Sequence, residues 1–129
     1  MMNWGYLAGF FDAEGCVRTN LQIGHRPQVR VSLAQKEENI LSQVRDFLAF
    51  EEIRAKVYYH RSTDSHELDI MAQRSVVLFL ERIKPLCLVK REAIEANLPQ
   101  AMKNAREDNL LPNPSGTGFG RFKPHSRPV

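Results

Sequence analysis

The residues with the clearest potential for chemistry are two carboxylates near the start of the chain, Asp12 and Glu14. They close an apolar stretch, residues 7–15, that reads as a helix stopping at Gly15. Acidic side chains at a helix C-terminus are disfavoured by roughly 0.3–1 kcal/mol each, because that end carries partial negative charge. A local rule broken in this way indicates a functional site, and carboxylate oxygens are ligands for hard divalent cations. The alternative is an amphipathic core helix with a polar last turn.

Small residues recur along one side of the same helix. Gly5, Gly9 and Ala13 are spaced four residues apart, and together they form a smooth face along which another backbone can approach closely. The sequence therefore predicts a helix that contacts a second helix and delivers a carboxylate at the bottom of that contact.

Residues 7–15 resemble the nine-residue signature of the LAGLIDADG homing endonucleases. The signature is matched at Leu7, Ala8, Gly9, Asp12, Ala13 and Gly15, while Phe10, Phe11 and Glu14 are common substitutions and Trp4 often precedes it. The motif occurs once. Single-motif members resemble half an enzyme and work as homodimers, so the resemblance implies a dimer formed through the first helix. The expected interface residues are Gly5, Leu7, Ala8, Gly9, Asp12 and Ala13.

The same resemblance implies a site-specific DNA endonuclease that makes a double-strand break in a long pseudo-palindromic target. Such hydrolysis requires a divalent ion, here Mg²⁺, to activate water and stabilise the leaving oxygen. Glu14 is the candidate metal ligand, assisted by the backbone carbonyl of Gly15. In a two-fold dimer, two Glu14 side chains would converge below the helix pair. Asp12 is interpreted as a structural or supporting group rather than a direct ligand.

Two further positions are candidates by comparison with the family. Gln35 matches a polar residue that orders water near the metal, and Lys90 matches a catalytic lysine that stabilises charge at the scissile phosphate. The alternatives are a polar residue that ends a strand and a solvated lysine in the first turn of a helix. Because some LAGLIDADG proteins resemble RNA maturases or DNA-binding regulators, a cleavage-inactive nucleic-acid-binding protein is the alternative function. The presence of both Glu14 and Lys90 favours the nuclease.

Length and composition agree with a single domain. The chain has 129 residues, a net charge of +3 and two cysteines that are far apart in sequence. It has neither a disulfide framework nor an apolar run of membrane-spanning length, and its N-terminus lacks a targeting pattern. We therefore expect an intracellular protein, in the cytoplasm of a prokaryote or phage host or in an organelle. We expect no membrane association and no small-molecule cofactor.

Hydrophobic periodicity predicts an α+β domain with the element order α-β-β-α-β-β-α-α. Alternating patterns predict strands at residues 16–23, 28–33, 53–60 and 67–71. Amphipathic patterns predict helices at residues 7–14, 37–50, 75–83 and 90–106. By resemblance to the homing endonucleases, the four strands form one antiparallel sheet.

The face of these strands that points away from the core carries long polar side chains. In a major groove, Arg and Lys read guanine while Asn and Gln read adenine, and basic residues segregated from acids indicate a nucleic-acid partner. The alternative is a solvated sheet face. Glu67 and Asp69 could accept a hydrogen bond from cytosine or pair with a neighbouring arginine. The expected residues for binding double-stranded DNA are Arg18, Asn20, Gln22, Arg26, Gln28, Arg30, Ser32, Arg54, Lys56, Tyr58, His60, Arg61 and Asp69.

The end of the chain has a different composition from the rest. We expect residues 1–107 to form the endonuclease domain and residues 108–129 to form a basic tail rich in proline and glycine. Such a segment cannot build a packed core. Either it grips phosphates or it is a disordered end.

Overall fold

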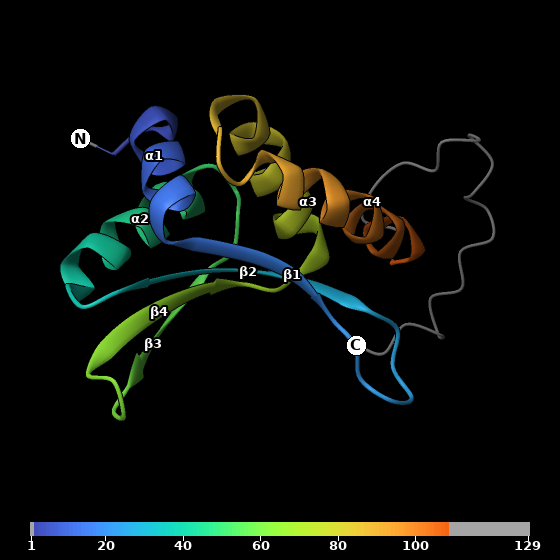
Figure 1. Ribbon diagram of the computed structural model, residues 1–129, viewed down its shortest axis with the longest axis horizontal. Coiled ribbons are helices and arrows are strands. Elements are labelled where there is room, and N and C mark those ends of the chain that lie inside the picture. Colours follow the sequence, from blue (N-terminus) through green and yellow to red (C-terminus); the bar gives the residue numbers. More distant parts are fainter. Residues whose placement is uncertain (1, 109–129) are drawn as a thin grey trace.

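The computed structural model describes residues 2–108 as four helices, four strands and a short 3-10 turn (Figure 1). In chain order these are α1 (Trp4–Glu14), β1 (Gly15–Asn20), β2 (Gln28–Gln35), α2 (Glu38–Phe50), β3 (Lys56–His60), β4 (Ser65–Ile70), α3 (Gln73–Ile83), η1 (Lys84–Leu86) and α4 (Arg91–Glu107). The predicted element order is confirmed. Residues 109–129 lie outside the described residues, so the expected tail and its boundary stay predictions. No helix of the described part is long and apolar enough to cross a membrane.

A single four-stranded sheet forms one layer of the molecule, with the strand order β1-β2-β4-β3. All neighbouring strands are antiparallel, as predicted. All four helices lie on one face of the sheet, and within residues 2–108 the opposite face is uncovered and arches between the two hairpin ends (Figure 1). This asymmetry gives the strands one face for the core and one face for a partner.

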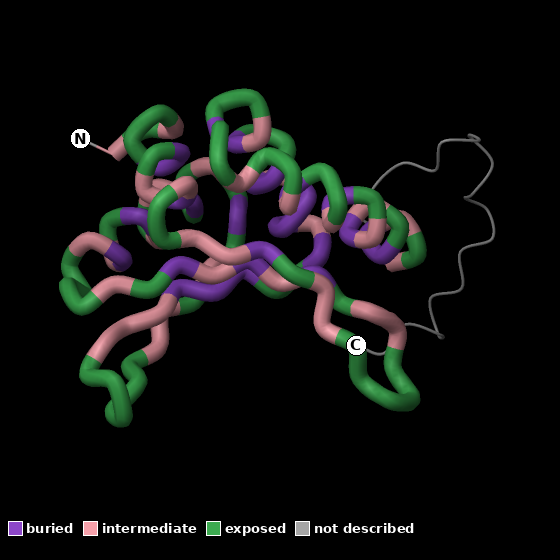
Figure 2. Tube along the Cα trace, in the orientation of Figure 1, coloured by how far each residue is buried: buried purple, intermediate pink, exposed green. Residues whose placement is uncertain are grey.

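The hydrophobic core lies between the helices and the sheet (Figure 2). Alternate strand residues supply its floor, namely Val17, Val29, Val31, Leu33, Leu68 and Ile70. Above them, the rings of Phe11 on α1 and Phe79 on α3 meet edge to face with centroids 5.4 Å apart. This packing fixes α1 over the sheet, so that its C-terminal end runs directly into β1.

The first strand is shorter than predicted. The alternation of apolar residues continues to Ile23, but β1 ends at Asn20, and Leu21 and Ile23 are exposed. Residues 21–27 instead form the loop of the β1–β2 hairpin, where His25 N–H donates to the Gln22 carbonyl and Gly24 adopts a φ of 83°. The periodicity therefore runs past the region where helices cover the sheet (Figure 2).

The third strand also begins later than predicted, at Lys56 instead of residue 53. Ile53 belongs to the connection that follows α2, where its N–H donates to the Leu48 carbonyl over 2.8 Å. Its side chain is buried in the core. Glu52, with a φ of 65°, makes the tight change of direction before it. Because Ile53 is buried and continues the alternation of Ala55 and Val57, the sequence pattern does not distinguish it from a strand residue.

Candidate active site and nucleic-acid interface

Helix α1 has two sides with different environments. Leu7 and Ala8 are buried in the chain's own core, so they cannot form the contact surface with a second chain, and that part of the predicted interface is wrong. Gly5, Gly9 and Ala13 lie on the exposed side. A Cβ atom built on Gly9 would meet nothing within 4 Å. Packing within the protomer therefore does not require a glycine at this position.

Gly15, which ends the motif, is fixed by a close contact. A Cβ atom at this position would come within 2.1 Å of the Phe11 ring, although the φ of −85° is ordinary for any residue. Since Phe11 is completely buried, the ring cannot move aside. The glycine therefore lets the end of α1 pass directly into β1 over a core aromatic ring, and this transition places Glu14 at the surface.

Glu14 is the exposed carboxylate at the C-terminal end of α1. It lines a hollow of about 250 Å³ together with Ala34, Gln35, Lys36 and Ser65. The structure thus brings Glu14 and Gln35 together, although they are 21 positions apart in the sequence. Lys36 at the same hollow was missed as a candidate. Its sequence signals were its position beside Gln35 and its place in a segment, residues 15–36, whose charged residues are all basic.

Gln35 also has a local structural role. Its Oε1 accepts hydrogen bonds from the backbone N–H of Lys36, at 2.8 Å, and of Glu37, at 3.5 Å. These bonds support the turn from β2 into α2. Its Nε2 has no hydrogen-bond partner among the described residues. The side chain therefore keeps two donor hydrogens beside Glu14 while its oxygen fixes the turn.

Asp12 lies on another side of α1 and anchors the segment before α4. Its carboxylate accepts hydrogen bonds from the backbone N–H of Leu88, Val89 and Lys90 at 2.8, 3.1 and 3.0 Å. Burial alone would raise the pKa of Asp12, but these amide donors together lower it below its ordinary value. Asp12 therefore has a structural role within its own chain, in line with its interpretation as a supporting group, and its expected contact with a dimer partner stays a prediction.

Lys90 reaches the same helix end. Its Nζ donates to the Asp12 backbone carbonyl over 2.9 Å. The last carbonyls of a helix lack partners within the helix, and a cation there is favoured by the helix dipole. The structure thus brings Lys90 to the end of α1, but not into the hollow that Glu14 lines with Gln35.

The donor set for a divalent cation is small in one chain. The described residues contain no group of three or more His, Cys, Asp or Glu side chains that could hold a metal ion. Glu14 and the Gly15 carbonyl are the oxygen groups at the end of α1 that would hold such an ion. This set fits Mg²⁺, which binds through one or two carboxylates and takes its remaining ligands from water and substrate phosphates.

The uncovered face of the sheet carries most of the predicted DNA-binding side chains. Strand alternation places Arg18 and Asn20 of β1 on this face, because the neighbouring Val17 is buried in the core between the sheet and the helices. The same alternation places Gln28, Arg30, Ser32, Lys56, Tyr58, His60, Glu67 and Asp69 there. Gln22, Arg26, Arg54 and Arg61 belong to loops that flank the strands.

Two acids on β4 change the character of this face at its centre. Asp69 is 2% exposed, and its Oδ2 accepts from Arg30 Nη2 over 2.6 Å. Glu67 Oε2 lies 3.7 Å from the same nitrogen, and His60 Nε2 lies 2.8 Å from Glu67 Oε1. Of the two alternatives for these acids, the structure shows pairing with a neighbouring arginine. Asp69 as a residue that contacts DNA directly is therefore wrong, because its carboxylate is covered.

The two carboxyl groups of this cluster titrate differently. Burial, followed by the neighbouring Glu67, raises the pKa of Asp69 to about 6. The pKa of Glu67 is lowered, chiefly by its hydrogen-bonding contact with Asp69 and then by His60. The hydrogen bond to Asp69 raises the pKa of Arg30. As the pH falls, this acidic pair therefore takes up its first proton on Asp69.

Arg26, which was expected to bind DNA, is held by the end of α4. Its guanidinium lies 3.2 Å from Glu107 Oε1 and 2.8 Å from Asp108 Oδ2. Nearby, the Asn104 side chain donates to the Pro27 carbonyl over 2.8 Å. These contacts fasten the β1–β2 hairpin to the helical layer. The structure thus gives Arg26 an anchoring role that its position in a basic segment did not indicate.

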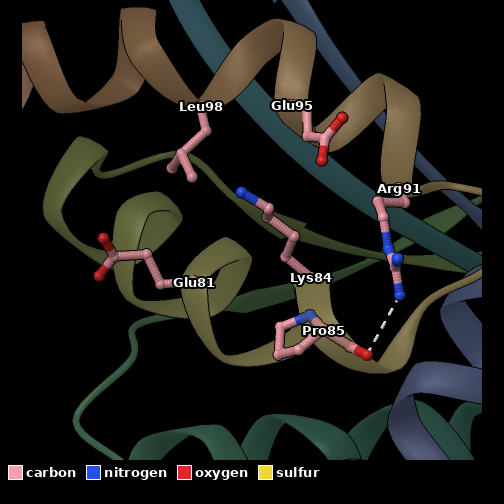
Figure 3. A pocket seen from close by; sticks show the side chains of 6 residues that line it. All are labelled: Glu81, Lys84, Pro85, Arg91, Glu95 and Leu98. Atoms are coloured by element: carbon pink, nitrogen blue, oxygen red, sulfur yellow. Dashed lines mark hydrogen bonds between the residues drawn. The ribbon is translucent and has the colours of Figure 1, made fainter.

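A second hollow lies within the helical layer, between α3, η1 and α4 (Figure 3). It contains two acids and two bases, and Arg91 Nη2 donates to the Pro85 carbonyl at its edge over 3.3 Å. The residues that line it are Glu81, Lys84, Pro85, Arg91, Glu95 and Leu98. None of them belongs to the uncovered sheet face or to the hollow beside Glu14.

Comparison with known proteins agrees with this geometry. The family model described as a LAGLIDADG-like domain matches residues 2–84. The chain therefore belongs to the LAGLIDADG family, as the signature at residues 7–15 predicts. No curated protein sequence matches the chain.

Solved homing endonucleases have the same fold. The homing endonuclease I-CvuI, in complex with its target in the presence of calcium, has a TM-score of 0.69 at 20% identity. That match covers 83% of this chain and 71% of I-CvuI. I-TnaI has a TM-score of 0.66 at 21% identity over 85% of this chain and 78% of its own. The LAGLIDADG meganuclease I-CpaMI, bound to uncleaved DNA, has a TM-score of 0.69 at 17% identity, over 90% of this chain but 42% of its own.

Proposed function

We propose that the protein is a site-specific DNA endonuclease of the homing type, which cuts both strands of a long pseudo-palindromic target as a homodimer. One observation carries the proposal. The exposed carboxylate of Glu14 lies at the C-terminal end of α1, the helix whose exposed side carries Gly5, Gly9 and Ala13. This helix end leads directly into the sheet, whose polar face is uncovered within the described residues. A dyad along that side of α1 would give two sheets, two carboxylates and one duplex between them.

The homodimer proposal is supported by the exposed side of α1 and by the single copy of the signature. The space around Gly9 leaves room for another backbone, and small residues permit close helix contact. The chain carries the signature once and aligns with less than half of I-CpaMI. A second copy would supply the other half. The proposed interface is centred on Gly5, Gly9 and Ala13, without the buried Leu7 and Ala8.

Double-stranded DNA as the substrate is supported by the sheet and by the relatives. The arched face carries the bases Arg18 and Lys56 and the amide side chains of Asn20 and Gln28, which suit the phosphates and the base edges of a duplex. I-CvuI was solved with its target and I-CpaMI with DNA. Two identical sheets related by a dyad would prefer a site with inverted symmetry.

In this proposal the divalent cation is Mg²⁺, held by Glu14 and the Gly15 carbonyl with phosphate and water oxygens. When bound, it would supply an activated water and stabilise the charge on the leaving oxygen. The chain's own residues then have separate roles. Gln35 orients a water through its Nε2 donors, and Lys90, fixed at the helix end by the Asp12 carbonyl, places positive charge near the scissile phosphate.

The test is incubation of the protein with a randomised duplex library, with Mg²⁺ or with a chelator. We expect cleavage of both strands with Mg²⁺ only, at sites that have inverted symmetry. Binding without cleavage in either condition would contradict the nuclease and leave a binding protein of the maturase or regulator type.

The dimer is tested by Gly9→Leu, because the protomer itself has space at this position. The substitution should leave the protomer folded, since leucine has a higher helix propensity than glycine by roughly 0.7 kcal/mol. It should abolish the dimer in analytical ultracentrifugation and abolish cleavage with it. A monomeric variant that still cuts both strands would contradict the shared site. Gly15→Ala is not a suitable control, because its Cβ would collide with Phe11.

A further inference from the structure

We propose that Asp69 and Glu67 hold Arg30 in one orientation on the uncovered face, so that Arg30 reads the edge of a base and does not serve as a phosphate contact. This inference rests on the proposed function. It makes Arg30 a specificity-determining residue and the two acids its positioning residues.

The first support is the geometry of the ion pair. Arg30 is on β2 and Asp69 on the adjacent β4, where Asp69 stands opposite Ser32 and so diagonally from Arg30. The Asp69 side chain is 1% exposed and the Arg30 side chain 31% exposed. The carboxylate thus lies beneath the guanidinium and holds it from the sheet side. The exposed part of the guanidinium belongs to the uncovered face of the sheet, where the proposed duplex would bind.

The second support is the set of donors that remains on Arg30. Its Nη2 donates to Asp69, and its Nε is buried without a partner. Its Nη1 has no hydrogen-bond partner among the residues that the structure describes. Bidentate reading of guanine needs two donors of one guanidinium, directed at O6 and N7. The hydrogens left on Nη1 and Nη2 are sufficient for this, and the bond to Asp69 limits the directions in which they point.

The third support is the local charge. Arg30 lies between two carboxylates, at 2.6 and 3.7 Å, so the cluster as a whole offers no excess positive charge to a phosphate. Binding through phosphates depends on uncompensated positive charge that displaces counterions. A fixed arginine whose charge is balanced is suited to directional hydrogen bonding instead.

The sheet contains a matched arginine for comparison. Arg18 on β1 pairs in register with Arg30, on the same face. Among the described residues, it has no carboxylate within ion-pair distance, and its Nε donates to the Asn20 side chain over 3.1 Å. The two arginines therefore share strand position and face, and differ in their acidic partners. We expect Arg18 to contribute to phosphate binding and Arg30 to base selection.

The experiment is selection of bound sequences from a randomised duplex library, without Mg²⁺ so that no cleavage occurs. The proteins are the unmodified chain, Arg30→Lys, Asp69→Ala, Asp69→Asn and Arg18→Ala. The unmodified chain should prefer guanine at one position in each half of the site. Arg30→Lys keeps the charge but not the planar fork, so it should reduce that preference by roughly tenfold. Asp69→Ala should reduce the preference at the same position, and Asp69→Asn should do so less.

Arg18→Ala is the control. It should weaken binding to all sequences alike and lower the slope of affinity against salt by about one counterion. Circular dichroism of each variant checks the fold. If Asp69→Ala does not fold, the guanine preferences of Arg30→Lys and Asp69→Asn still test the inference. An unchanged guanine preference in both Asp69 variants, or in Arg30→Lys, would overturn the inference and leave the proposed function standing. Absence of duplex binding by the unmodified chain would overturn both.

Discussion

The chain contains two pairs of acids with the same spacing, and the two pairs behave differently. Asp12 and Glu14 end α1, while Glu67 and Asp69 lie in β4. In a helix, residues two apart point to different sides, and in a strand they share a face. Asp12 therefore bonds the segment before α4 while Glu14 is exposed at the hollow. Glu67 and Asp69 instead compete for one arginine.

This comparison shows that the backbone geometry of a helix or a strand determines the environment and the role of each carboxylate. The helix separates an anchoring acid from a reactive one, so each has its own environment. The strand couples its acids, and their pKa values move in opposite directions as a result. Only the helical pair leaves an exposed carboxylate, Glu14, that has no ion-pair partner among the described residues, as a metal ligand requires.

The largest expected effect is at Glu14. Glu14→Gln keeps the shape of the side chain and removes the charge that would hold a divalent cation. Single-turnover cleavage with Mg²⁺ should fall by roughly three orders of magnitude. DNA affinity should persist or increase, because a negative charge near the phosphates is removed. Normal cutting by this variant would remove Glu14 from the active site.

A smaller effect is expected at Asp12, because its role is anchoring. Asp12→Ala leaves three backbone N–H groups without their acceptor, and the free energy of unfolding at pH 7 should fall by about 2 kcal/mol. Cleavage should fall by roughly tenfold, since the Asp12 carboxylate no longer fixes the backbone of Lys90, although the backbone carbonyl that accepts from Nζ is kept. Urea denaturation and single-turnover kinetics measure the two effects. Glu14→Gln is the matched control, and an equal loss of stability there would contradict the division of roles.

The smallest effect concerns the strand pair and pH. The pKa of Asp69 is raised to about 6, above its value of 3.8 in a model peptide, so the folded protein binds this proton more tightly than the unfolded chain. The contribution of Asp69 to stability is therefore complete below about pH 4 and is lost as the pH rises through 6. Going from pH 7.5 to 5.5 should also weaken the hold on Arg30 and reduce base preference a few-fold.

Competition binding between two sequences that differ at the selected position measures this change. Asp69→Asn should be insensitive over the same range. His60→Gln is a needed control, because histidine side chains titrate in this range and the His60 imidazole lies 2.8 Å from Glu67. The other charged neighbour is Lys56, which is opposite Asp69 on β3. A pH response that survives in Asp69→Asn but disappears in His60→Gln would assign the effect to the histidine.

The local pattern of the sequence was sufficient for the fold. Four alternating segments predicted the strands, because burial on one face leaves a period of two in a strand. The single antiparallel sheet was implied by the family resemblance that the signature at residues 7–15 carries. The errors in the strand bounds occurred where alternating apolar residues did not belong to a strand. Ile23 continues the alternation into an exposed loop, and Ile53 is buried from a loop.

The site was less predictable, because its geometry depends on contacts between distant segments. Nothing local indicates that Asp12 accepts three bonds from residues 88–90, or that Arg26 is bound by Glu107 and Asp108. Leu7 and Ala8 belong to the motif but are buried in the core of their own chain. The helical period alone does not show which side of α1 faces this core and which side is exposed. Asp69 was identified as a polar residue on the right face, but its burial under Arg30 required the neighbouring strand.

The two-sided character of α1 has a consequence for the order of folding and assembly. Leu7, Ala8 and Phe11 complete the core of a single chain, and no residue from outside that chain is needed to bury them. Folding and association are then separate equilibria. The thermal midpoint of a variant that cannot associate should not vary with protein concentration, whereas an obligate dimer would melt at higher temperature as it is concentrated. Such a protomer would persist as a folded species after dilution and could exchange partners without unfolding.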